Sequence, residues 1–136
     1  TTEASPGPGA EVLATRDLVW VGAPGGTAWQ RRPLRLGFKD SCFFRPIAQA
    51  ALDEAGIPWE MGFEGENEQV IEATVAADLA VSARMRGALP AEMEPIESPN
   101  ALPPLGQLHI CLYDAGTRKD PVGEAIRAQI RCAYCC

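Results

Sequence analysis

The residues best suited to chemistry in this sequence lie in the stretch KDSCFFRPIAQAALDEAG, residues 39–56. Cys42, Phe43, Phe44 and Arg45 stand directly before Pro46, and proline is tolerated in a helix only within its first turn. The residue before a proline is biased away from helical conformation, so we predict a helix that begins near residues 43–45 with Arg45 as its cap. The four residues then lie at a helix N-terminus, where free N–H groups attract anions.

The thiol of Cys42 is a candidate nucleophile, because thiolates are favoured near helix N-termini. Nucleophilic catalysis also needs a base within reach, and the only histidine is His109. His109 alternates with Ile110 and Leu112, which is typical of a structural histidine on a strand. We therefore predict no catalytic residue and no enzyme, with a thiol-dependent enzyme or redox sensor using Cys42 kept as an alternative.

Neither a metal site nor a cofactor site is predicted. Cys132, Cys135 and Cys136 crowd the C-terminus, but a fourth ligand at zinc spacing is missing, so reduced thiols are the simpler interpretation. The sequence also lacks a P-loop and the patterns G-x-G-x-x-G, H-E-x-x-H and G-x-S-x-G. The twelve lysine and arginine residues are scattered, and the formal net charge is -6. Such a surface repels phosphate, so this segment is not expected to hold DNA by itself.

Hydrophobic periodicity predicts strands that alternate with helices. Strands are expected at 17–22, 34–38, 59–63, 79–83 and 107–113, with a short edge strand within 93–97. Helices are expected from 43 to 55, after Gly65, and from 121 to 132, the last with Asp120 as its N-cap. No apolar run approaches the roughly 20 residues that span a bilayer, so a cytoplasmic protein is expected. The alternation predicts an α/β fold with helices on the faces of a sheet.

The stretch EGENEQ, residues 64–69, also joins a strand to a helix. Ligands of open α/β sheets bind outside the carboxyl ends of the strands, so the loops 41–45 and 64–67 are expected to face one crevice. Two simpler interpretations stay open. Phe44 continues the apolar stripe of its helix and can be core, and Arg45, like the acidic residues Glu64, Glu66, Glu68 and Glu72, can be solvated.

Taken in order, five segments resemble the rear part of the effector-binding module of LysR-type transcriptional regulators. They are DLVWVGAPGG, RRPLRLGFKDSCFFRPIAQAALDEAGIPWEMGFEG, EQVIEATVAADLAVSARMRGALP, LPPLGQLHICLY and DPVGEAIRAQI. One departure is Asp78, where the family commonly has a glycine to end the helix; aspartate tolerates the left-handed conformation better than most residues.

The resemblance implies a three-layer lobe of the periplasmic-binding-protein-like (type II) fold, with a mixed, mostly parallel sheet flanked by helices. Residues 1–16 would be an inter-lobe connection, 17–112 the second lobe, and 113–136 a return strand and helix toward a missing first lobe. A small organic inducer would bind between the lobes, and the helix N–H groups and Arg45 favour an anionic one. The residues carried over are Ser41, Cys42, Phe43, Phe44, Arg45, Glu64, Gly65, Glu66 and Asn67.

The resemblance also implies partners. A homodimer is expected, DNA would be bound only through a missing N-terminal winged helix-turn-helix, and no membrane is involved. The last helix, with Val122, Ala125, Ile126 and Ile130 inward, would fold back onto this lobe or pack against a second chain. An extracytoplasmic solute-binding protein lobe is the alternative with the same fold, although five cysteines without evident pairing disfavour an oxidising compartment.

Overall fold

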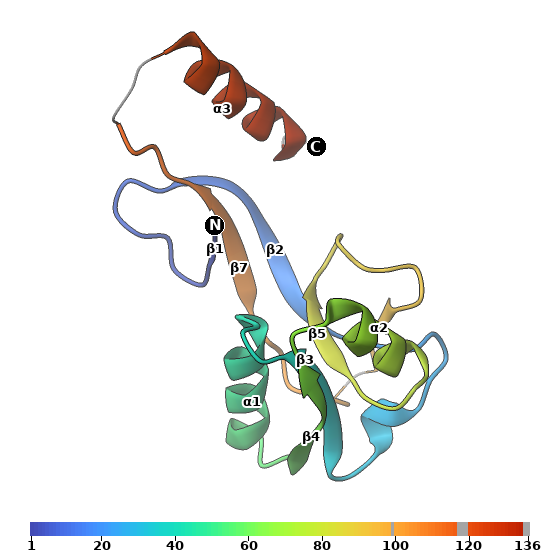
Figure 1. The fold of residues 1–136 in the computed structure, drawn as a ribbon. Helices are drawn as coiled ribbons and strands as arrows, with labels where there is room; N and C mark the ends of the chain where they lie inside the picture. Colours follow the sequence, from blue (N-terminus) through green and yellow to red (C-terminus); the bar gives the residue numbers. More distant parts are fainter. Residues whose placement is uncertain (99, 117–119, 135–136) are drawn as a thin grey trace. The chain divides into compact units, whose positions relative to one another are not determined.

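Three parallel strands form the centre of the structure, a computed structural model that describes residues 1–98, 100–116 and 120–134. β3 (Leu34–Lys39) pairs in parallel with β4 (Trp59–Gly65), and Leu36 also bridges in parallel to Val81, directly before β5 (Ser82–Met85). β5 pairs antiparallel with β2 (Glu11–Gly22), which pairs in turn with β6 (Glu94–Pro95). The isolated bridge thus links the parallel pair β4-β3 to the antiparallel strands β5-β2-β6, and the arrangement is mixed, as predicted (Figure 1).

The two helices of this sheet cover its opposite faces. α1 (Phe44–Glu54) connects β3 to β4, and α2 (Glu68–Ala76) connects β4 back across β3 to β5. The two connections step across the sheet in opposite directions, so right-handed crossovers place their helices on opposite sides. Figure 1 shows α1 and α2 on either side of the strands. The predicted three-layer α/β arrangement is confirmed.

The core follows the predicted periodicities closely. Leu34, Leu36 and Phe38 alternate along β3 and are all buried. Ala48 and Leu52 are the buried residues of α1, and Ile71 and Val75 are those of α2. The period of two on β3 and of three to four on the helices therefore brings these side chains into one apolar core.

Three local predictions are wrong. Helix α1 begins at Phe44, with Phe43 at the cap position, so Arg45 lies inside the first turn. Proline only disfavours a helical conformation of the residue before it and does not forbid one. Pro46 itself fits in the first turn of α1, because the N–H group that proline lacks would have no helical partner there. Strand β5 begins at Ser82 and leaves Leu79 in an exposed turn. Val70, which the sequence pattern places on the inner face of α2 with Ile71 and Val75, is 39% exposed.

Asp78 ends α2 in the left-handed conformation and also anchors a distant turn. Its φ is 61°, which shows that the turn survives without glycine. Its carboxylate accepts hydrogen bonds from the backbone N–H groups of Thr27 (3.0 and 3.1 Å) and Ala28 (2.9 Å). The N–H groups of Thr27 and Ala28, followed by the Thr27 hydroxyl and the charge of Arg31, lower the pKa of Asp78. A Cβ on Gly26 would lie 2.4 Å from the same carboxylate, so a larger residue there would displace Asp78.

The chain divides into two compact units. Residues Asp17–Gly106 form the sheet and helices just described, and Thr1–Arg16 with Gln107–Cys136 form the second unit. In the second unit β1 (Thr2–Glu3) pairs antiparallel with β7 (Gln107–Leu112), which lies beside β2. The Tyr113 hydroxyl closes the N-terminal loop by donating to Glu3 (2.7 Å) and accepting from the Gly7 N–H (2.9 Å).

The C-terminal helix α3 (Pro121–Tyr134) is held by ion pairs. Asp120 caps it by accepting from the Gly123 N–H (2.6 Å), as predicted. Arg131 binds both carboxylate oxygens of Glu11 (2.7 and 2.8 Å), and Arg127 binds Asp114 (2.6 Å). No described residue of α3 is buried within this chain, and the expected packing of its apolar side against the lobe or a second chain stays a prediction. Among the described residues, no helix is long and apolar enough to cross a membrane.

We predict that Leu52→Ala lowers the free energy of unfolding by about 2–5 kcal/mol, since it removes a fully buried side chain from between α1 and the sheet. Chemical denaturation measures the change. Leu79→Ala is the matched control, because Leu79 is 52% exposed and its truncation should cost less than about 1 kcal/mol. Equal losses from the two variants would contradict the packing described here.

The carboxylate of Asp78 makes stability depend on pH. Because its pKa is lower in the folded chain than its ordinary 3.8, the stabilisation is full above that value and disappears as the pH falls through the folded pKa. We predict that Asp78→Asn lowers unfolding free energy by about 1 kcal/mol at pH 7 and that the difference from the native chain shrinks below pH 3.8. Urea denaturation over this range measures it, and a constant difference would rule out the carboxylate as the cause.

Candidate ligand-binding loops

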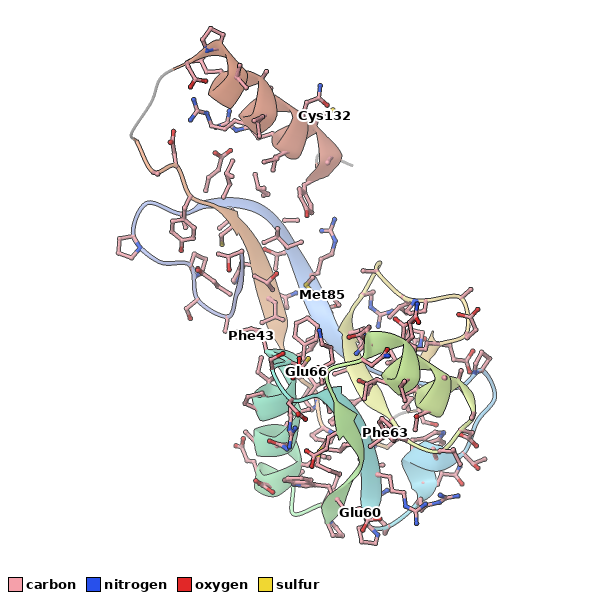
Figure 2. The ribbon with its side chains drawn as sticks, viewed as in Figure 1. Phe43, Glu60, Phe63, Glu66, Met85 and Cys132 are labelled. Carbon is pink, nitrogen blue, oxygen red and sulfur yellow. The ribbon has the colours of Figure 1, made fainter. Side chains whose placement is uncertain are left out.

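The parallel pairing of β3 and β4 brings the two predicted loops together. Lys39 and Gly65 are partners at the carboxyl ends of the two strands, and the Asp40 N–H donates to the Gly65 carbonyl (3.2 Å). Figure 2 shows Phe43 and Glu66 at this end of the strands, while Glu60 lies at the other end. The loops 41–45 and 64–67 are therefore neighbours, which the sequence could only suggest through their equivalent positions after a strand.

Ser41 and Glu66 form the most direct link between the loops. The Ser41 N–H donates to one carboxylate oxygen of Glu66 (3.0 Å), and the Ser41 hydroxyl donates to the other (2.8 Å). This is a two-pronged arrangement in which a backbone and a side-chain donor hold one carboxylate. The donors that Ser41 offers to an anion are thus already occupied by the chain itself.

Arg45 forms a second link. Its guanidinium lies 3.0 Å from Glu64 and 3.6 Å from Asp40, and its side chain is only 22% exposed. The interpretation of Arg45 as a freely solvated charge is therefore wrong. Glu64 and Glu66 are not simply solvated either, because they bind Arg45 and Ser41. A ligand with a carboxylate would have to compete with Asp40 and Glu64 for Arg45.

The remaining predicted residues differ in how much of each side chain is exposed and in whether its polar atoms are already hydrogen-bonded. Asn67 caps α2, because its side-chain oxygen accepts from the N–H groups of Gln69 (3.0 Å) and Val70 (3.4 Å). Phe43 is 51% exposed and meets Phe44 edge to face, with ring centroids 6.3 Å apart. Phe44 is partly buried, so the interpretation of Phe44 as core is only partly right. Cys42 is a partly buried free thiol.

The only histidine of the sequence has a hydrogen-bond partner, and the described residues contain no metal cluster. The Nδ1 atom of His109 is hydrogen-bonded to the Thr15 hydroxyl (3.0 Å), which is the structural role expected for it. Within residues 1–98, 100–116 and 120–134, no three potential ligands are close enough together to hold a metal. Cys132 is exposed, and Cys135 and Cys136 lie outside the described residues.

Sequence reasoning missed two charged residues beside the loops. Asp40 was not recognised as a partner of Arg45, although it follows directly on β3. Arg84 of β5 is only 13% exposed; it donates to the Ser82 hydroxyl (2.9 Å) and pairs with Glu68 at the start of α2. The sequence could have indicated this ion pair, because Arg84 lies within a predominantly apolar stretch that is expected to be buried, and a buried charge needs a partner of opposite charge.

The two loops present one apolar face and several polar groups at the ends of β3 and β4. An exposed aromatic ring, a thiol and several carboxylates lie at the ends of the two strands. The hydrogen-bond donors there, on Ser41 and Arg45, are already bonded to Glu66 and Glu64. A ligand can use the Phe43 face directly, and reaches the polar groups by exchanging with existing hydrogen bonds.

Comparison with known proteins identifies the fold. No family model matches the sequence, and no curated protein matches it. Among solved structures, the chain is similar to the Synechocystis PCC6803 CcmR regulatory domain in complex with 2-PG, with a TM-score of 0.65 and 9% identity over 98% of this chain and 72% of that one. It is also similar to full-length HypT from Salmonella typhimurium, a hypochlorite-specific LysR-type transcriptional regulator, with a TM-score of 0.61 and 13% identity over 92% of this chain.

The chain has the fold of LysR-type regulatory domains. This fold is shared more widely, since the chain also resembles ytmK of Bacillus subtilis, a probable extracellular-binding protein of an amino-acid ABC transporter. That match has a TM-score of 0.57 and 9% identity, and covers 91% of this chain and 58% of ytmK. The predicted periplasmic-binding-protein-like lobe is confirmed as a fold. The chain spans 46% of full-length HypT, so it corresponds to under half of that regulator.

The contact between Ser41 and Glu66 predicts local protection of the first loop. We expect Glu66→Ala to speed hydrogen exchange of the Ser41 amide by about tenfold, since one net hydrogen bond is lost there. Exchange measured by NMR or mass spectrometry tests this. Glu54→Ala is the control, because Glu54 is an exposed acid at the far end of α1. Unchanged exchange in Glu66→Ala would mean that the two loops are not joined in solution.

Proposed function

We propose that this chain is the second-lobe part of the effector-binding domain of a LysR-type transcriptional regulator. Residues 17–112 would be the lobe, with 1–16 as a connection and 113–136 returning toward a first lobe. The chain would act in the cytoplasm as part of a homodimer, bind DNA only through a winged helix-turn-helix elsewhere in the protein, and catalyse no reaction. The observation that carries the proposal is the pair of loops joined at the carboxyl ends of β3 and β4, in a fold shared with such domains.

The proposed ligand is a small organic effector that lies against loops 41–45 and 64–67. Phe43 would supply its apolar surface, while Ser41, Cys42, Phe44, Arg45, Glu64, Gly65, Glu66 and Asn67 would surround it. The ligand bound to CcmR, 2-PG, supports a small-molecule site in this fold. An anionic effector would have to displace Glu66 from Ser41, or Asp40 and Glu64 from Arg45. The exchange of these internal bonds would give the loops two states, and a ligand acts as a switch only through unequal affinity for two states.

A solute-binding protein lobe is the second candidate, because ytmK shares the fold. The encoded N-terminus of the parent gene distinguishes the two. A winged helix-turn-helix followed by a long helix supports the regulator, and a signal peptide supports the solute-binding protein. A gene with neither would reopen the case for Cys42 as a reactive thiol.

We predict that effector binding to the parent protein changes its affinity for promoter DNA by about 5- to 150-fold, the range of typical coupling free energies. Phe43→Ala should weaken effector binding roughly tenfold by removing an exposed aromatic anchor. Calorimetry and a DNA mobility-shift assay measure the two effects. Leu79→Ala, which truncates an exposed residue at the opposite end of α2, should change neither. A promoter complex that is the same with every bound effector would contradict the regulatory role.

A further inference from the structure

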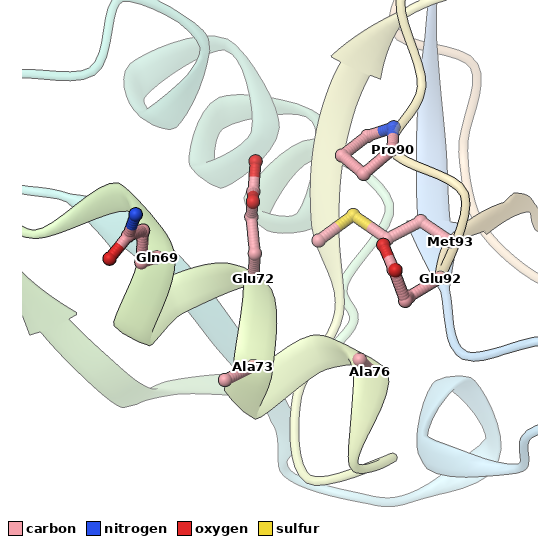
Figure 3. A pocket seen from close by; sticks show the side chains of 7 residues that line it. All are labelled: Gln69, Glu72, Ala73, Ala76, Pro90, Glu92 and Met93. Carbon is pink, nitrogen blue, oxygen red and sulfur yellow. The ribbon is translucent and has the colours of Figure 1, made fainter.

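A groove separate from the two loops runs between α2 and residues 90–93. It has a volume of about 210 Å³, and both of its walls belong to the unit Asp17–Gly106. Figure 3 shows Glu72, Ala73 and Ala76 of α2 on one side, and Pro90, Glu92 and Met93 on the other. Its floor is apolar and its rim is acidic.

The floor of the groove is part of the core. Met93 is 5% exposed and packs with Val21 and Val75 in one buried cluster, so its position is fixed by the core beneath it. Ala73 and Ala76 present only methyl groups toward the groove, which leaves the space open. The groove is therefore preformed and does not depend on a flexible side chain moving aside.

The two carboxylates on the rim differ from most others in this unit. Glu60, Glu64, Glu66, Glu68, Glu94 and Glu97 each bind an arginine or an N–H group. Glu72 and Glu92 line the groove from its two sides, and within the described residues neither side chain has a hydrogen bond or an ion pair. Two uncompensated negative charges thus flank an apolar floor.

The size of the groove restricts what it can hold. Pockets for drug-sized ligands occupy about 300–1,000 Å³, which is more than this groove offers. An arginine or lysine side chain combines an apolar stem with a cationic head, and so matches both the floor and the rim. We propose that this groove is a docking site for one basic side chain of a partner protein, with its stem on Met93, Ala73 and Ala76 and its head between Glu72 and Glu92.

An arginine fits this site better than a lysine. Its planar guanidinium has donors on two edges, so it can bond to carboxylates on both sides of the groove, whereas an ammonium group acts as a point charge. Buried or half-buried arginines are also frequent anchors of protein interfaces. The site is distinct from the effector loops, and its test does not depend on the proposed function.

Methyl and amide NMR of the full 136-residue chain provides the test, with the peptides acetyl-Gly-Arg-Gly-amide, acetyl-Gly-Lys-Gly-amide and acetyl-Gly-citrulline-Gly-amide. Citrulline keeps the shape of arginine and removes its charge. We expect the arginine peptide to shift the Met93, Ala73 and Ala76 signals at millimolar concentration, the lysine peptide to bind more weakly, and the citrulline peptide to leave these signals unchanged. Added salt should weaken binding, because the rim charges are exposed.

Charge-neutral variants test the rim directly. Glu72→Gln and Glu92→Gln should each weaken binding of the arginine peptide about threefold, as expected for partly exposed ion pairs. Glu54→Gln removes the same charge on α1 and should have no effect. Amide spectra of each variant confirm that the fold is retained.

Three results would overturn the proposal. The first is equal binding of the arginine and citrulline peptides, and the second is an equal loss of affinity in Glu54→Gln. The third is tighter binding of agmatine than of the arginine peptide, which would make the groove a site for free small amines rather than for a protein side chain.

Discussion

The hydrogen bonds between the parallel strands β3 and β4 are the constraint on which the candidate site depends. Their register places Lys39 opposite Gly65, and one further bond joins Asp40 to Gly65. Each strand then continues into a loop and a helix, and the two helices lie on opposite faces of the sheet. Without this pairing, Ser41 and Glu66 would be 25 residues apart with nothing to hold them together.

Polar groups beside the strand ends are already bonded to one another. Ser41 holds Glu66, and Arg45 holds Glu64 and Asp40. Such contacts keep the loops ordered in the absence of a ligand, and any ligand that uses the same donors exchanges one set of hydrogen bonds for another. The affinity of such a ligand would depend on the difference between the hydrogen bonds within the chain and those that it forms with the loops, while Phe43 is an exposed apolar surface.

The second unit of the chain is stabilised differently from the sheet and helices of Asp17–Gly106. Its helix α3 makes ion pairs through Arg127 and Arg131, and has no buried residue. Exposed ion pairs contribute little to stability, so the apolar side of α3 is the part of this unit with the most to gain from a covering surface. The same amphipathic pattern gives a buried face in α1, where a sheet lies beside it.

The sequence by itself determined the α/β class, the central core and the order of most strands and helices, while β1 and residues 11–16 of β2 were missed. Alternation along β3 and the stripes of α1 and α2 encode burial directly, because each side chain's direction follows from the local backbone. The Asp120 cap could also be predicted, because it involves a residue only three positions away, Gly123. The resemblance in sequence pattern also led to the correct fold, although the CcmR domain and HypT share only 9% and 13% identity with this chain.

Tertiary structure decided which distant charged residues pair and which apolar helix faces are buried. The bonds of Glu66 to Ser41, of Asp78 to Thr27 and Ala28, and of Glu68 to Arg84 join residues that no local pattern relates. The amphipathic pattern of α3 showed which side is apolar, but burial requires a neighbouring surface, and no described residue of that helix is buried. Local sequence fixes backbone conformation and side-chain direction, whereas the partner of a charge or an apolar face depends on which elements the folded chain brings within contact distance.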